Sequence, residues 1–150
     1  MAKFDWYEAT YFESNPIELI ERIGRANPFA MIEPDAPKYG YRVGQVFRHG
    51  QDAMARVWWE GNEGVHVSTT SSYAHDLAPL LREHGVHSVT RLDACEDWVE
   101  HGLFDRIANH LIAYAVEHRI TITQLGDWVR GEARTIYLGS KQSAVRLVLY

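Results

Sequence analysis

The chain has 150 residues, is 46% hydrophobic and carries a formal net charge of −5 at pH 7. A chain of this length buries about two thirds of its unfolded surface in one core, so we expect a single domain over residues 1–150. The composition excludes a disordered chain, and the acidic balance argues against indiscriminate nucleic-acid binding, which needs many cations to neutralise phosphates.

The sequence also restricts the compartment. No window approaches the roughly 18 apolar residues of a membrane span, and the N-terminus lacks the apolar segment of a signal peptide. The one cysteine, Cys95, cannot form an internal disulfide. We therefore expect a cytoplasmic protein without a membrane partner.

The first elements follow from aromatic content and capping residues. Phe4 to Phe12 is aromatic-rich and predicts a strand. Asn15 and Pro16 supply an N-cap and a favoured first helical residue, so a helix should follow and end within residues 24–27. Three prolines within residues 28–38 predict a loop.

The middle of the chain predicts a meander and a second helix. Three strands are expected over residues 39–48, 53–59 and 65–70, because turns rich in Gly and Asn separate them. The second helix should begin near Asp76, leave Pro79 in its first turn, and end at Gly85.

The last part of the chain again alternates strands and helices. A long strand is expected over residues 86–98, and a third helix over residues 103–118, with an apolar stripe of Phe104, Ile107, Ala108, Leu111 and Ala115. Further strands are expected over residues 120–129 and within a closing hairpin. The element order predicts an α+β fold, a largely antiparallel sheet with about three helices packed on one face.

The strand at residues 87–98 carries charge where a core strand would not. Regular alternation puts Leu92 and Trp98 on one face and Arg91, Asp93 and Asp97 on the other. The two aspartates are then about 13 Å apart at Cα, so Asp93 needs partners from adjacent strands to hold a metal ion. Arg91 and Asp93 can be near neighbours. One interpretation is a cross-strand ion pair on a solvated face, and the other is metal-assisted phosphate chemistry.

The C-terminal stretch is the most basic part of the chain. Residues 134–150 hold Arg134, Lys141 and Arg146 and no acidic residue. The turn beginning at Gly139 and Ser140 offers backbone amides, hydroxyls and an ammonium to a phosphate. Turns of this composition are common and most bind nothing, so the motif is weak by itself.

Three segments together resemble a known family. These are FDWYEATY near the start, TRLDACEDW at 90–98 and ARTIYLGSKQSAVRLVLY at 133–150. They resemble the rolling-circle replication initiation factors of filamentous phages, small plasmids and conjugative elements. In that family, an Arg-x-Asp-x-x-x-Asp strand precedes Gly-Arg-Thr-x-Tyr-x-Gly-Ser-x-x-Ser. The matching positions here are Arg91, Asp93, Asp97, Arg134, Thr135, Tyr137, Gly139, Ser140, Ser143 and Arg146, while Ala133 replaces the family's Gly.

The resemblance implies a function that this chain carries only in part. Complete members nick and rejoin one DNA strand by metal-assisted attack of a tyrosine on a phosphodiester. The family pattern continues past Tyr150, so we expect residues 1–150 to be the N-terminal part of a longer initiator that lacks the nucleophile segment. The implied DNA contacts are Arg91, Arg134, Ser140, Lys141 and Arg146, and the implied ligands of a Mg or Mn ion are Asp93 and Asp97.

Two other functions stay open at this point. The first is a non-catalytic DNA-binding or regulatory module on the same scaffold. The second is an unrelated α+β domain that forms a homodimer through its aromatic N-terminal strand. His84 and His87 are interpreted as surface or capping residues, and one indole of Trp58 and Trp59 as exposed.

Overall fold

The structure is a computed structural model, and it describes residues 3–150. The described residues form three helices and nine strands, all of the strand pairs being antiparallel, which confirms the α+β prediction. The chain divides into two compact units, Met1–Glu96 and Asp97–Tyr150, called here the N-terminal and C-terminal units. Each unit has its own hydrophobic cluster where one core was expected.

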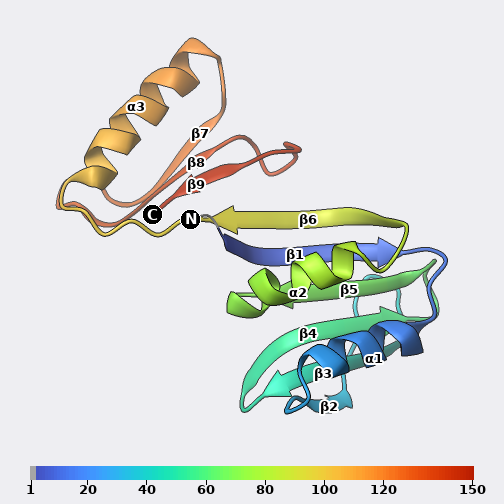
Figure 1. Cartoon of the computed structure of the whole chain (residues 1–150). Coiled ribbons are helices and arrows are strands. Elements are labelled where there is room, and N and C mark those ends of the chain that lie inside the picture. Colours follow the sequence, from blue (N-terminus) through green and yellow to red (C-terminus); the bar gives the residue numbers. More distant parts are fainter. Residues whose placement is uncertain (1–2) are drawn as a thin grey trace. The chain divides into compact units, whose positions relative to one another are not determined.

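A six-stranded sheet forms the N-terminal unit, in the order β2-β3-β4-β5-β1-β6 (Figure 1). Its strands are β1 (Lys3–Tyr11), β2 (Met31–Pro34), β3 (Val43–His49), β4 (Asp52–Trp59), β5 (Val65–Thr70) and β6 (His87–Cys95). The meander of β3, β4 and β5 is confirmed, and β1 lies between β5 and β6. The prolines of residues 28–38 did not prevent β2, because a short edge strand needs hydrogen bonds on one side only.

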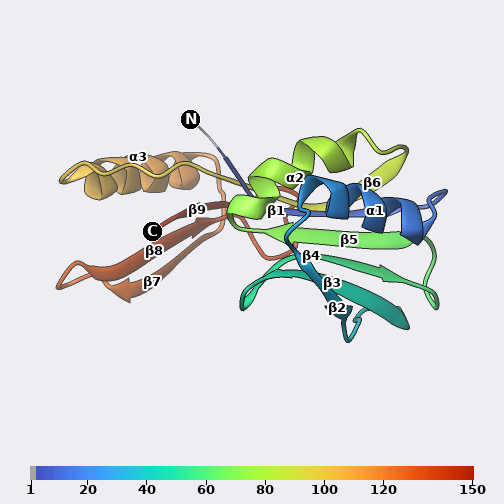
Figure 2. The same cartoon turned by 60° about the horizontal axis from the view of Figure 1, so that its bottom comes forward.

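Helices α1 (Pro16–Ala26) and α2 (Ser72–Arg82) cover one face of this sheet (Figure 2). The predicted cap of α1 is present, since Oδ1 of Asn15 accepts the backbone N–H of Ile17 at 2.9 Å. Apolar residues of both helices pack on the strands, in a cluster that includes Tyr7, Ala9, Tyr11, Leu19, Ile23, Phe47, Val57, Val67, Leu77 and Leu81.

Two element boundaries in this unit differ from the prediction. Helix α2 begins at Ser72 rather than near Asp76, and it contains Pro79 in its interior, on the exposed side. Strand β3 begins at Val43 rather than at Tyr39. The physical reason in the second case is that Tyr39 and Gly40 have φ angles of 55° and 86°, which no strand accommodates.

The C-terminal unit packs one helix on a three-stranded sheet. Helix α3 (Leu103–Glu117) lies against β7 (Ile122–Asp127), β8 (Glu132–Leu138) and β9 (Leu147–Leu149), which are ordered β7-β8-β9. Four of the five residues of the predicted stripe, Phe104, Ala108, Leu111 and Ala115, belong to the cluster that also contains Ile136 and Leu138. This unit therefore buries its helix as the helical periodicity predicted.

Candidate nucleic-acid interface

The face of the six-stranded sheet opposite the helices is polar. Because Tyr7 and Ala9 of β1 face the helices, the intervening Glu8 faces the other way. Glu8 pairs with Ser68 of β5 and with Arg91 of β6, and Ser68 pairs with Arg56 of β4. The register thus places an Arg-Ser-Glu-Arg row across four strands, and we call this surface the polar face.

Arg91 is held in a fixed orientation on the polar face. Its guanidinium carbon lies 4.0 Å from the centroid of the Trp6 ring, and Nε donates to both carboxylate oxygens of Asp93 at 3.1 Å. Nη2 also donates to Asp93, and these hydrogen bonds raise the pKa of Arg91. None of the hydrogen bonds among the described residues uses Nη1, so this nitrogen can donate to a phosphate.

The strand β6 does not have the regular alternation that the sequence analysis assumed. Arg91 pairs with Glu8 and Val89 with Ala9, so Thr90 is the extra residue of a β-bulge. The bulge places Val89 and Arg91 on opposite faces, although both were predicted on one. Leu92, predicted as a core contact, is 51% exposed on this edge strand, although it pairs with the buried Tyr7 of β1.

The predicted metal ligands do not form a site in the described residues. Strand β6 ends at Cys95, so Asp97 lies in the following loop, within the C-terminal unit, and the regular spacing from Asp93 does not apply. The carboxylate of Asp93 accepts hydrogen bonds from Arg91. Within residues 3–150, no three His, Cys, Asp or Glu side chains gather as a metal ion would require.

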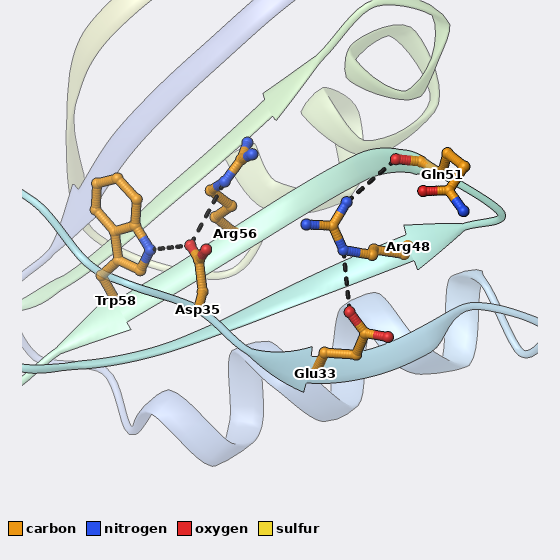
Figure 3. Close-up of polar contacts among 6 residues, drawn as sticks. All are labelled: Glu33, Asp35, Arg48, Gln51, Arg56 and Trp58. Atoms are coloured by element: carbon orange, nitrogen blue, oxygen red, sulfur yellow. Dashed lines mark hydrogen bonds and ion pairs between the residues drawn. The ribbon is translucent and has the colours of Figure 1, made fainter.

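A second polar network, which the sequence analysis missed, lies at the β2–β4 end of the same sheet (Figure 3). Oδ2 of Asp35 accepts the indole N–H of Trp58 at 2.6 Å and lies 3.4 Å from Nε of Arg56. Nearby, Arg48 of β3 pairs with Glu33 of β2 and donates to the carbonyl of Gln51. Only the tertiary fold brings Asp35 to Trp58, so no spacing in the sequence signals this contact.

His66 lies beside this network and is almost completely buried. Its ring stacks on Trp58, at 5.4 Å between centroids, and contacts the ring of Tyr41. Burial lowers the pKa of His66, while the carboxylate of Glu8 acts in the opposite direction. Its Nε2 is buried and has no hydrogen-bond partner among the described residues. Trp58 is only 5% exposed, and Trp59 is half-buried and packs against the hydrophobic cluster of the N-terminal unit, so neither is the exposed indole that the sequence analysis expected.

The predicted basic residues of the C-terminal unit have different surroundings. Arg134 donates to Asp105 and lies 4.3 Å from the ring centroid of Phe104 and 5.6 Å from that of Trp128. Its side chain is only 18% exposed. Arg134 therefore packs against α3, and the same contact lowers the pKa of Asp105.

The loop between β8 and β9 presents the other two cations. Lys141 is exposed, and so is Arg146, whose guanidinium carbon lies 4.0 Å from the Tyr137 ring centroid. Oγ of Ser143 accepts the backbone N–H of Ser140 at 2.9 Å, and Oγ of Ser140 accepts that of Gln142. The loop is thus organised by its own hydroxyls, by the contact of Arg146 with Tyr137 and by the hydrogen bond from the N–H of Gly139 to the carbonyl of Thr121.

Comparisons of the chain with protein-family models, with curated protein sequences and with solved structures give no significant match. Among the described residues, no helix has the length and apolar character that crossing a membrane requires.

Proposed function

We propose that this chain binds DNA as the N-terminal part of a rolling-circle replication initiation factor. The complete protein would nick and rejoin one DNA strand at an origin by metal-assisted attack of a tyrosine, in the cytoplasm. We also propose that two copies of this chain form a homodimer.

One observation carries the proposal: the residues of the family-like segment fold into a single hairpin with an exposed basic loop. Arg134 and Tyr137 lie on β8, and Ser140, Lys141 and Arg146 lie in the loop that follows. This loop combines an ordered turn with two exposed cations. Such a loop suits contact with a phosphate, because amides and hydroxyls position the phosphate and cations neutralise its charge.

The distribution of charge supports the same surface. The C-terminal unit, residues 97–150, has six Lys and Arg and six Asp and Glu, so its formal charge is zero. The excess of acidic residues lies in residues 1–96, which hold 9 basic and 14 acidic residues. A DNA strand that approaches the hairpin therefore meets a neutral unit with a locally basic loop.

The residues of this chain bind and orient rather than react. Lys141 and Arg146 would contact the DNA backbone, and Arg91, already oriented by Trp6 and Asp93, would add a second phosphate contact. We assign no nucleophile to Tyr137 or Tyr150. The divalent ion proposed for the complete protein enters no step here, because the described residues gather no ligand set for it.

The test is binding to labelled single-stranded and hairpin DNA over a salt titration, with and without Mn²⁺. The wild-type chain should bind at low salt, with affinity that falls steeply as salt rises. A Lys141→Ala, Arg146→Ala variant should weaken binding and lower the slope of log K against log salt by about 0.7 for each lost contact to single-stranded DNA.

A matched control is Arg25→Ala, which removes one exposed cation from α1. It should leave both the affinity and the salt slope unchanged. Absence of binding at low salt would contradict the proposal, and equal losses in the control would show that net charge alone matters. Light scattering on the same samples tests the homodimer.

A further inference from the structure

Tyr39 combines an unusual backbone conformation with an exposed ring. Its φ angle is 55°, and the side chain is 68% exposed. Left-handed backbone is unfavourable at a residue other than Gly and is uncommon for bulky side chains. Exposure of a large ring offers no compensating burial, so the position calls for an explanation.

The turn that carries Tyr39 is firmly held. Nδ2 of Asn62 donates to the carbonyl oxygen of Tyr39 at 3.2 Å, and the hydroxyl of Tyr41 donates to the carbonyl of Glu63. The two loops also approach closely, because a Cβ atom on Gly61 would lie 2.4 Å from the carbonyl oxygen of Gly40. The strained residue is therefore fixed by the neighbouring loop rather than free to relax.

Buried rings support one side of the Tyr39 ring. Its centroid lies 5.9 Å from that of Trp58 and 6.2 Å from that of His66, and these two rings stack on one another. Asp35 fixes the Trp58 indole through its N–H. The result is a cluster of three aromatic side chains in which Tyr39 is exposed, while Trp58 and His66 are buried and stack on one another. We call it the aromatic column.

Cationic and polar groups lie beside this column. Arg56 contacts the same Asp35 carboxylate, and its side chain is 34% exposed. Arg56 is also one end of the row of paired residues that crosses the polar face to Arg91. An exposed ring close to a guanidinium group is a combination that binds single strands, since bases stack on the ring and cations follow the backbone.

We propose that Tyr39 is a stacking platform for one unpaired base of single-stranded DNA, with Arg56 at the adjacent phosphate. This inference rests on the proposed function, because it names how that DNA is contacted on the polar face. The fixed backbone of Tyr39 lowers the entropy cost of binding, because the turn that carries the ring is already ordered.

The experiment compares two single strands that share a backbone. Fluorescence anisotropy measures the affinity for a labelled thymidine 12-mer and for a 12-mer with abasic sites throughout. The ring is removed by Tyr39→Asn, because Asn tolerates the left-handed conformation and keeps the turn. Stacking contributes about 1–3 kcal/mol per base, so Tyr39→Asn should weaken thymidine binding about 5- to 150-fold.

Three comparisons make the result specific. Binding of the abasic strand should be the same for wild type and Tyr39→Asn, and Tyr39→Phe should restore thymidine binding. Phe29→Asn removes another exposed ring of the N-terminal unit, 88% exposed, and should change neither affinity. Thermal denaturation of Tyr39→Asn should show a melting temperature equal to or above that of wild type.

The outcomes separate this inference from the proposed function. The stacking role would be overturned if Tyr39→Asn bound the thymidine strand as tightly as wild type does. It would also be overturned if Tyr39→Asn lost affinity equally for the thymidine and the abasic strands. Either result would leave DNA binding by the wild-type chain intact. Wild-type affinity that is equal for the thymidine and abasic strands would also overturn the stacking role. Wild type that binds neither strand would overturn both proposals together.

Discussion

The hydroxyl of Tyr7 donates a hydrogen bond to Nε2 of His87 at 2.9 Å and so links β1 to the first residue of β6. Nδ1 of His87 donates to the carbonyl oxygen of Gly85 at 2.7 Å, which leaves Nε2 as the acceptor. Next to this contact, the hydroxyl of Tyr11 donates to the carbonyl of Leu81 at the end of α2. Two buried tyrosines thus attach both the edge strand and the second helix to the sheet.

Replacing these hydroxyls should lower stability without changing the fold. Tyr7→Phe leaves Nε2 of His87 without its donor, and Tyr11→Phe removes one donor to the carbonyl of Leu81, which still accepts the backbone N–H of His84. Each change should lower the free energy of unfolding by about 0.5–1.5 kcal/mol, measured by urea denaturation. Tyr150→Phe, at a side chain that is 77% exposed, should have no effect. An unchanged midpoint in Tyr7→Phe would contradict the role of this contact.

Stability should fall as the solution becomes mildly acidic. Burial is the main cause that lowers the pKa of both His66 and His84 below the usual 6.5. The unfolded chain then binds protons at a higher pH than the folded chain does. The two neutral histidines contribute fully to the free energy of unfolding above about pH 6.5. This contribution is lost as the pH falls toward and through their folded-state pKa values.

A substitution at His66 tests this dependence. His66→Phe keeps an aromatic ring against Trp58 and removes the proton-binding site, so the loss of unfolding free energy between pH 7.5 and 5.5 should be smaller than in wild type. His75→Asn, at an exposed position of α2, is the control for a histidine outside the core. Equal pH dependence in wild type and His66→Phe would show that other groups cause it.

Arg134 should matter more for stability than the two exposed cations of the hairpin. Arg134→Ala loses its stacking on Phe104 and Trp128, which is worth about 0.5–2 kcal/mol, and the melting temperature should fall. Arg134→Lys keeps the charge but loses the planar stack, so it should be destabilised as well. Lys141→Ala should melt like wild type. If Arg134→Ala also melted like wild type, the packing role would be wrong.

The local elements of this fold were predictable, whereas its long-range contacts were not. Capping by Asn15 and the stripe on α3 depend on neighbours within one or two turns, so the pattern is sufficient. The bulge at Thr90 depends on how β6 pairs with β1, and it reversed the predicted face of half a strand. Division of the core into two clusters likewise depends on which elements meet.

The candidate site shows the same limit. Arg91 and Asp93 were expected to be near neighbours because they are two apart on a strand, and they form an ion pair within β6 rather than the cross-strand pair of one interpretation. The contact of Asp35 with Trp58 joins a loop to a strand 23 residues later, and no motif marks either residue. Arg134 was expected at a phosphate, but its ring contacts with α3 exist only in the folded unit.

Two glycine substitutions should have opposite effects because their backbone conformations differ. Gly126 forms the bulge of β7 with a φ of 90°, and a Cβ there would lie 2.1 Å from the carbonyl oxygen of Ala133. Gly126→Ala should therefore lower the free energy of unfolding by about 2 kcal/mol or more.

Gly24 lies inside α1, where a Cβ would only touch the ring of Phe47 at 3.8 Å. Gly24→Ala should raise stability by about 0.5–1 kcal/mol, since Ala loses less backbone entropy in a helix. Urea denaturation of both variants measures whether each substitution lowers or raises the free energy of unfolding. Destabilisation by Gly24→Ala would mean that α1 packs on β3 more tightly than the structure indicates.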